Sequence, residues 1–116
     1  MLPRQNRLPA RTKLNHPSIY RSRYFLVKSA EHGLAVSRFA FVVRKTIEKS
    51  AVRRNRARRV IRSCIEEMLP RIKNGVDMLF ILEKSIIGLK RDEVCGEIER
   101  FLKEKQLLNK EGKNQK

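Results

Sequence analysis

Apolar side chains recur at helical spacing along residues 51–69, and the pattern predicts an amphipathic helix. Ser50 precedes this segment and can accept a hydrogen bond from a free backbone amide of the first turn. We therefore expect Ser50 to be the N-cap and the helix to end near Pro70. Cys64 is interpreted as a small buried hydrophobic residue, because the two cysteines have no C-x-x-C or metal-ligand spacing. The stripe predicted to pack on a core consists of Ala57, Val60, Ile61, Cys64, Ile65 and Met68.

Two runs of β-forming residues precede this helix. Residues 22–29 and 36–44 flank a turn signal at residues 31–33, so they are expected to form an antiparallel hairpin. Alternation along a strand sends successive side chains to opposite faces. The side chains predicted to face the core are Phe25, Val27, Phe39, Phe41 and Val43.

Residues 76–82 are almost continuously apolar, which is typical of a strand buried on both faces. The strand–helix–strand order favours parallel pairing around the helix, and residues 90–107 predict a closing helix. Residues 1–18 contain three prolines and four basic residues, which indicates a basic arm that is extended or briefly helical. Residues 109–116 are polar and expected to be disordered. The prediction is one αβ domain over residues 19–108.

The polar side of the predicted helix carries a dense positive charge. Residues 49–62 include six arginines and no acid, and three of them lie in the first two turns, where the helix dipole is positive. Helix stability does not favour this arrangement, whereas a phosphate does, because guanidinium groups match its oxygens. The alternative is a solvated basic face. The side chains expected to meet an anion are Arg53, Arg54, Asn55, Arg56, Arg58, Arg59 and Arg62.

The outward faces of the two predicted strands form a second candidate surface. Their side chains are small, basic or aromatic, which suits single-stranded nucleic acid, because bases stack on aromatic rings while basic groups follow the backbone. An ordinary solvent-facing sheet surface is an equally good interpretation. The outward residues in question are Tyr24, Leu26, Lys28, Arg38, Ala40 and Arg44.

Charge is concentrated in the first half of this 116-residue chain, whose formal net charge is +16. Residues 1–62 hold 17 lysines and arginines against two acids, whereas residues 63–116 hold 11 against ten. We find neither a membrane-spanning run nor a signal-peptide region, and we expect a cytoplasmic protein without a membrane partner. The sequence has no glycine-rich phosphate loop, no metal-ligand spacing and no nucleophile matched to a base. The polypeptide alone is not expected to be catalytic.

Several segments together match one known family. They are Arg38-Phe39-Ala40-Phe41-Val42-Val43-Arg44-Lys45, then Lys49 and Ala51, then Arg54-Asn55-Arg56-Ala57-Arg58-Arg59 with Arg62, and finally residues 75–81 and the closing helix. This combination resembles the protein subunit of bacterial ribonuclease P, whose arginine-asparagine-arginine motif is similar to the arginine segment here. The resemblance covers about residues 22–108.

The resemblance implies an αβ sandwich of the ribosomal-protein-S5 second-domain type. In that fold a mixed four-stranded sheet contains a left-handed βαβ crossover, and the crossover carries the basic helix. The implied function is that of a ribonucleoprotein subunit in tRNA processing. The catalytic RNA, with bound Mg²⁺, acts as the endonuclease that hydrolyses the 5′ leader from precursor tRNA.

The resemblance also implies site residues. Lys45 and Lys49 join the arginines of the helix in contacting the catalytic RNA. The outward sheet face and the family's first helix form the cleft for the leader. This chain has Pro9 and Pro17 in the region of that helix and no phenylalanine before Phe25. Either Tyr20 takes the place of the missing aromatic residue, or the helix is shortened or absent.

Other functions are compatible with the charge and size. A ribosomal or general structured-RNA-binding protein is the main alternative. A protein nuclease that acts without RNA is a second, and a DNA-architectural protein ranks lower. Reconstitution with the catalytic RNA separates them, because a general binder would not restore leader cleavage at low Mg²⁺.

Overall fold

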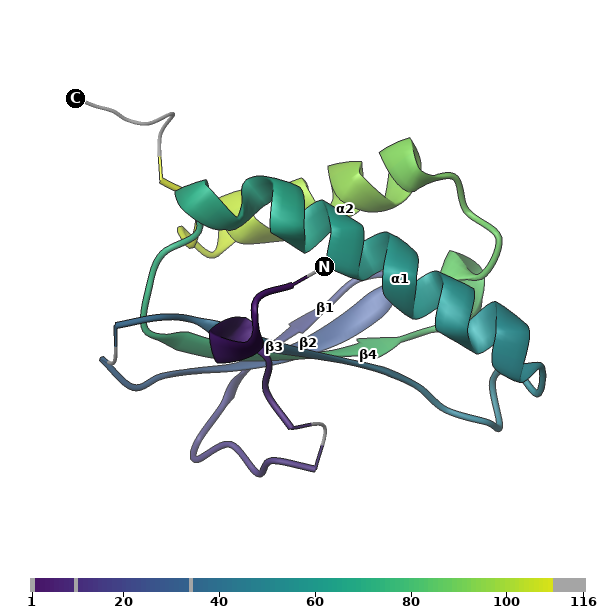
Figure 1. The fold of residues 1–116 in the computed structure, drawn as a ribbon, viewed down its shortest axis with the longest axis horizontal. Helices are drawn as coiled ribbons and strands as arrows, with labels where there is room; N and C mark the ends of the chain where they lie inside the picture. Colours follow the sequence, from purple (N-terminus) through teal and green to yellow (C-terminus); the bar gives the residue numbers. More distant parts are fainter. Residues whose placement is uncertain (1, 10, 34, 110–116) are drawn as a thin grey trace.

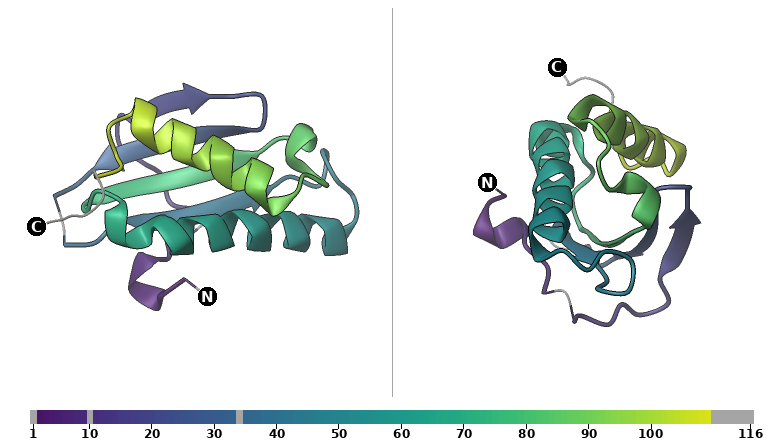
Figure 2. Two further views of the ribbon diagram at one scale, coloured as in Figure 1. Left: turned by 90° about the horizontal axis from the view of Figure 1, so that it is seen from above. Right: turned by 90° about the vertical axis from the view of Figure 1, so that its right-hand side faces the viewer.

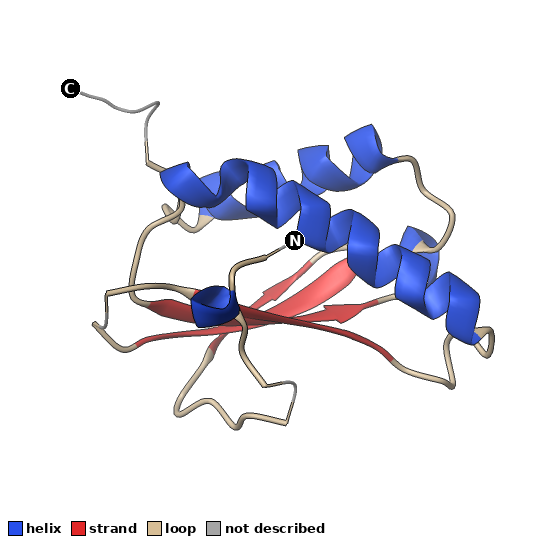
Figure 3. Ribbon diagram, viewed as in Figure 1, coloured by secondary structure: helices blue, strands red, loops and turns tan. Residues whose placement is uncertain are grey.

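The computed structural model describes residues 2–9, 11–33 and 35–109, which form a four-stranded sheet covered on one face by two helices (Figure 1, Figure 3). The strands lie in the order β1-β2-β4-β3. The elements in chain order are η1 (Arg4–Asn6), β1 (Ser18–Arg21), β2 (Phe25–Glu31), β3 (Arg38–Val43), α1 (Ala51–Met68), η2 (Leu69–Arg71), β4 (Val76–Leu82), η3 (Lys84–Ile86) and α2 (Arg91–Glu104).

The strand β4 lies between β2 and β3, so the predicted hairpin of residues 22–29 and 36–44 is wrong. β2 runs antiparallel to β4 and β3 runs parallel to it, with Val27 and Phe41 both opposite Phe80. The side chains of β4 that face the helices, Met78, Phe80 and Leu82, are buried. Leu79 and Ile81 on the open face are half-buried, so the predicted burial on both faces is incomplete, because helices cover one face only. The predicted parallel pairing across the helix is confirmed.

Strand β2 instead forms a hairpin with β1, which the sequence did not predict. Tyr20 pairs with Val27, and Ser22 closes the turn by accepting hydrogen bonds on Oγ from the backbone amides of Tyr24 and Phe25 at 3.1 and 3.2 Å. The four-residue β1 is mostly exposed and carries little apolar signal, so its strand character comes from pairing with β2.

The core lies between the sheet and the two helices, and its side chains are those that the alternation predicted. Phe25, Val27, Phe39, Phe41 and Val43 are all buried. The phenylalanine of α2 joins them: the Phe101 ring centroid lies 5.8 Å from that of Phe80 and 6.3 Å from that of Phe25. On α1, the buried residues are Ile61, Cys64, Ile65 and Met68, with Ala57 and Val60 packed at the margin.

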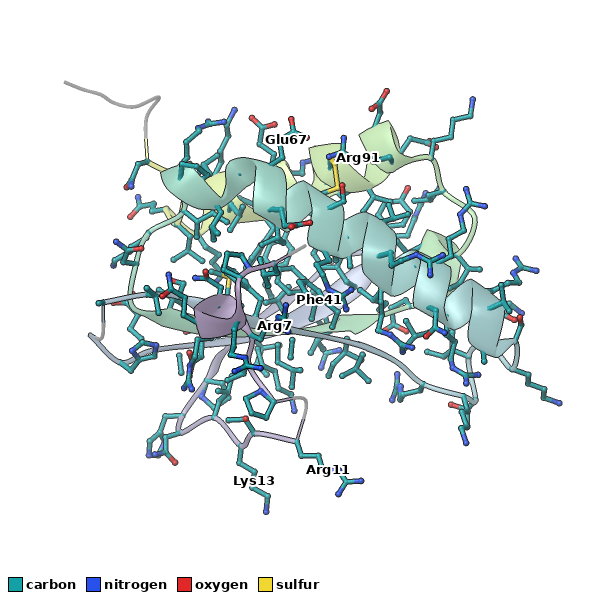
Figure 4. All side chains as sticks on the ribbon, in the orientation of Figure 1. Arg7, Arg11, Lys13, Phe41, Glu67 and Arg91 are labelled. Atoms are coloured by element: carbon teal, nitrogen blue, oxygen red, sulfur yellow. A yellow bond between two sulfur atoms is a disulfide. The ribbon has the colours of Figure 1, made fainter. Side chains whose placement is uncertain are left out.

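Cys64 is not a buried free thiol, because it forms a disulfide with Cys95 of α2 (Figure 4). The two Cα atoms are 5.1 Å apart, within the usual range for a disulfide. The pair is separated by 31 residues, and only the packing of α2 beside α1 brings it together. At the same contact, Arg91 Nη2 lies 2.6 Å from Glu67 Oε1.

The N-terminal segment is docked on the protein. Leu2 and Leu8 are buried, Asn6 Nδ2 donates a hydrogen bond to the Ser37 carbonyl at 2.8 Å, and the Leu8 amide donates to the Phe39 carbonyl at 2.8 Å. Its helical part within the described residues is the three-residue η1. The chain then loops beneath the open sheet face to β1 (Figure 2), and Arg11 and Lys13 point away from the sheet (Figure 4).

Candidate nucleic-acid interface

The start of α1 is the one that the sequence predicts. Ser50 is the N-cap, and its Oγ accepts a hydrogen bond from the Arg53 amide at 3.2 Å. Arg54 stabilises the turn before α1, because its Nη1 donates hydrogen bonds to the carbonyls of Glu48 and Lys49, each at 2.8 Å. Arg54 therefore has a structural role in addition to its charge.

Three arginines, four residues apart, form a column along one side of α1. Arg54, Arg58 and Arg62 are each half-buried, and Arg58 Nη2 donates a hydrogen bond to Asn55 Oδ1. Burial lowers the pKa of the Arg58 guanidinium below its ordinary value, and the charges of Arg54 and Arg62 lower it further. Three cations that are crowded and partly desolvated favour an anionic partner. This trio is called the arginine column below.

The arginine column ends at a cavity. Arg62 Cζ lies 5.9 Å from the centroid of the Phe41 ring, a cation–π distance, and both line a cavity of about 340 Å³ between α1, β3 and the N-terminal segment. Arg7 also lines it and donates from Nε to the Leu2 carbonyl at 3.0 Å. The docked N-terminal segment thus brings one more guanidinium to this end of α1, a contribution that the sequence pattern did not predict.

The other predicted RNA-contacting residues lie outside the arginine column. Those that are exposed lie on α1 or in the segment before it. Within residues 2–9, 11–33 and 35–109, one of the predicted RNA-contacting residues forms an ion pair with a carboxylate. It is Arg53, whose Nε lies 3.6 Å from Glu48 Oε1. The structure therefore gathers the predicted set on a single helix and the turn before it. The exposed members are Lys45, Lys49, Arg53, Asn55, Arg56 and Arg59.

The second predicted surface is divided between the two faces of the sheet. Tyr20 lies on the helix-covered face, with its ring centroid 4.8 Å from that of Phe101. Burial raises the pKa of the Tyr20 phenol, and the nearby charges of Glu104 and Glu97 add to the effect. Tyr24 follows the turn after β1 and packs against the core. The two tyrosines are thus not grouped with the outward residues: Tyr20 faces the helices because it pairs with the inward Val27, and Tyr24 lies in the turn before β2, where strand alternation does not set its direction.

Arg38 is engaged within the protein. Its Nε lies 2.9 Å from Asp77 Oδ1 and its Nη2 lies 2.7 Å from Asp77 Oδ2, a two-pronged pair. His32 Nε2 lies 3.0 Å from the same Oδ1, and Asp77 is 6% exposed. The hydrogen bond to Asp77 raises the pKa of Arg38. The sequence contained one signal for this pair. Asp77 is a lone acid in the apolar run 76–82, and a buried carboxylate requires a partner.

What remains of the outward face is largely apolar. Leu26 pairs with Ile81, and Lys28 pairs with Leu79, which in turn pairs with Ala40 on β3. Ile19 on β1 is 45% exposed beside them. At the end of the sheet, Arg44 Nη2 is 3.9 Å from Glu83 Oε1, a loose and exposed pair. Of the predicted residues, Leu26 and Lys28 share this surface, with Arg44 at its edge, whereas Ala40 lies on the same side of the sheet but is 5% exposed.

Neither a metal-binding cluster nor a membrane-spanning helix is found within the described residues. They contain no group of three or more histidine, cysteine, aspartate or glutamate side chains arranged to hold a metal ion. Nor does any helix there have the length and apolar character needed to cross a membrane.

A mixed sheet with two helices on one face, and a crossover helix that displays a column of arginines, defines a small α+β domain with a strongly basic surface. The Ribonuclease P family model matches residues 2–106. The chain belongs to this family, which confirms the resemblance seen in its sequence.

Relatives named Ribonuclease P protein component share about a third of their residues with the chain. The protein of Synechococcus sp. is 33% identical over 62% of this chain, and that of Synechocystis sp. is 36% identical over 71%. These matches span 54% and 63% of the two relatives. The protein of Pelotomaculum thermopropionicum is 31% identical, over 73% of this chain and 75% of its own length.

Solved structures of RNase P proteins have the same fold. The protein from Thermotoga maritima superposes with a TM-score of 0.70 at 24% identity, covering 77% of this chain and 84% of that one. The protein from Staphylococcus aureus gives a TM-score of 0.71 at 21% identity, covering 80% and 84%.

Proposed function

We propose that the protein is the protein component of ribonuclease P and works in the cytoplasm on precursor tRNA. It binds the catalytic RNA and the 5′ leader, while the RNA performs the endonucleolytic cleavage. The observation that carries the proposal is the arginine column, Arg54, Arg58 and Arg62, on a helix of a chain that belongs to this family.

The arginine column acts by neutralising phosphates. Each guanidinium donates in a plane that fits phosphate oxygens, and partial burial strengthens such a contact. A phosphate beside Arg58 also relieves the repulsion that Arg54 and Arg62 exert on it. Two polyanions, the catalytic RNA and precursor tRNA, must come together in the holoenzyme. A basic subunit at their junction lowers that repulsion and makes binding strongly salt-dependent.

Leader binding is proposed for the outward sheet face. Lys28 and Arg44 supply charges that can follow a phosphate backbone, and Leu26 supplies apolar contact for bases, whereas Ala40 is buried and adds none. Arg38 is assigned a structural role, because both prongs of its guanidinium contact Asp77.

Mg²⁺ is assigned to the RNA. When bound there, it supplies Lewis-acid activation of the hydrolysed phosphodiester. The polypeptide contributes binding and positioning only: its basic residues hold the two RNAs in register.

The test is reconstitution of leader cleavage with the catalytic RNA at limiting Mg²⁺. We compare wild type with Arg58→Ala/Arg62→Ala and with a matched control, Arg100→Ala/Lys103→Ala, which removes the same charge from the exposed side of α2. We expect the first variant to lose affinity on the order of tenfold per arginine, because hydrogen bonds to charged groups are strong. Its salt slope should fall by about two. The control should behave as wild type.

Two results would contradict the proposal. Equal RNA affinity of the two double variants would show that the arginine column is not the contact surface. Tight RNA binding by wild type without restored leader cleavage would favour a general structured-RNA-binding protein, a function that the net charge of +16 supports by itself.

A further inference from the structure

A second cavity lies on α1, away from the arginine column. It has a volume of about 200 Å³ and lies between the first turns of α1, the η3 turn and the start of α2. From α1, Ala57 and Val60 contribute to its walls, and Ile86, Ile87 and Leu89 contribute from the opposite side. The volume is below the roughly 300–1,000 Å³ of sites for drug-sized ligands, so one ring system is a suitable occupant.

Two positions with small residues leave this cavity open. Ala57 lies on the apolar stripe of α1, where a larger side chain would occupy the space. Gly88, at the opposite wall, has a φ of +85°, a conformation that favours glycine. A Cβ built on Gly88 meets no atom within 4 Å, so this wall faces open space.

Two guanidinium groups flank the apolar walls. Arg53 and Arg56 both line the cavity from α1, and their spacing of three residues places them on the same side of the helix. The Arg53 side chain is 60% exposed. Apolar walls beside arginines match an unpaired nucleotide, whose base enters the apolar space while its phosphates meet the charges. An apolar side chain of a protein partner would gain nothing from the arginines.

We infer that this cavity binds one unstacked base of the structured RNA partner, with Arg53 and Arg56 contacting the flanking phosphates. The inference rests on the proposed function, since it identifies a specific contact of the same RNA. It adds a site that reads an unpaired nucleotide, whereas the arginine column contacts the backbone.

The test uses substitutions that keep every charge. Ala57→Phe fills the cavity from α1, and Ile87→Ala removes part of the opposite wall. The matched control is Ala51→Phe, which adds the same ring at an exposed position of the same helix outside the cavity. Affinity for the catalytic RNA is measured at two salt concentrations, with circular dichroism as a check of folding. We expect both cavity variants to bind on the order of tenfold more weakly, the loss of one stacked base, with an unchanged salt slope.

A second measurement identifies the occupant on the RNA side. Catalytic RNAs that each lack one base are bound to wild type and to Ala57→Phe. Removal of the base at one unpaired position should weaken binding to wild type on the order of tenfold, and the same removal should have no effect on binding to Ala57→Phe. This coupling keeps the inference testable even if one cavity variant is destabilised.

The inference is overturned if Ala57→Phe and Ile87→Ala bind as tightly as Ala51→Phe, or if no base removal is coupled to Ala57→Phe. If that occurs while wild type still restores leader cleavage at limiting Mg²⁺, the proposed function stands and the cavity inference fails. If wild type restores no cleavage, both fail.

Discussion

Reduction of the disulfide between Cys64 and Cys95 is expected to lower the stability of the protein without altering its RNA-binding surface. The bond joins positions 31 residues apart. A cross-link of that span removes about 12 cal/mol/K of entropy from the unfolded chain, which corresponds to about 3.7 kcal/mol at 25 °C. For 116 residues the unfolding entropy is roughly 0.24 kcal/mol/K. Dividing the free-energy loss by this entropy gives a fall of roughly 15 °C in the midpoint of thermal unfolding.

The assay is thermal unfolding followed by circular dichroism, with and without dithiothreitol. The control is Cys64→Ala/Cys95→Ala, whose midpoint should not respond to the reductant. RNA affinity is measured at a temperature where the reduced protein is still folded, and it should be unchanged, because Cys64 lies on the buried side of α1. Disulfides are rare in cytosolic proteins, so the reduced form is the one expected in the proposed compartment.

Three outcomes would refute the reasoning. An unchanged midpoint on reduction would show that the cross-link does not constrain the unfolded chain. Titration of two free thiols in the native protein without reductant would show that the bond is not formed. A large loss of RNA affinity in the folded, reduced protein would mean that the helix pair must be cross-linked to present its arginines.

Two further predictions concern charged and titratable groups on the sheet. Arg38→Ala should lower the unfolding free energy in urea by about 2–3 kcal/mol, because it leaves the Asp77 carboxylate buried with fewer partners. Arg38→Ala/Asp77→Ala should recover part of that loss, and an Arg38→Ala protein of wild-type stability but weak RNA binding would contradict the structural role. Tyr20 has a folded-state pKa above its ordinary value of 10.0. Its contribution to the free energy of unfolding is therefore present below pH 10 and is lost as pH rises through the folded-state pKa. Tyr20→Phe should therefore lose less stability than wild type between pH 9 and pH 11 in urea titrations; identical losses would refute this.

Local patterns predicted those elements whose signals lie within a few residues. The Ser50 cap, the start of α1 and its apolar stripe all follow from helical spacing. The inward phenylalanines of β2 and β3 follow from alternation. In each case the interacting groups are neighbours along the chain or share a fixed period, so sequence alone contains the geometry.

Pairings over long distances in the chain were not predictable in the same way. The turn signal at residues 31–33 suggested a hairpin, yet β4, more than 30 residues further on, lies between β2 and β3. A loop signal marks where the chain bends but does not identify the partner of the next strand. The disulfide depends in the same way on how α2 packs beside α1.

The candidate site shows the same division. Its charge and its place on α1 could be deduced from residues 49–62, because a helix fixes which side chains project together. Tertiary structure alone decided that Arg38 pairs with Asp77, that Tyr20 packs on Phe101, and that Arg7 reaches the end of the arginine column. Each of these contacts joins segments separated by more than 30 residues, and only the folded backbone brings such segments within reach of a side chain.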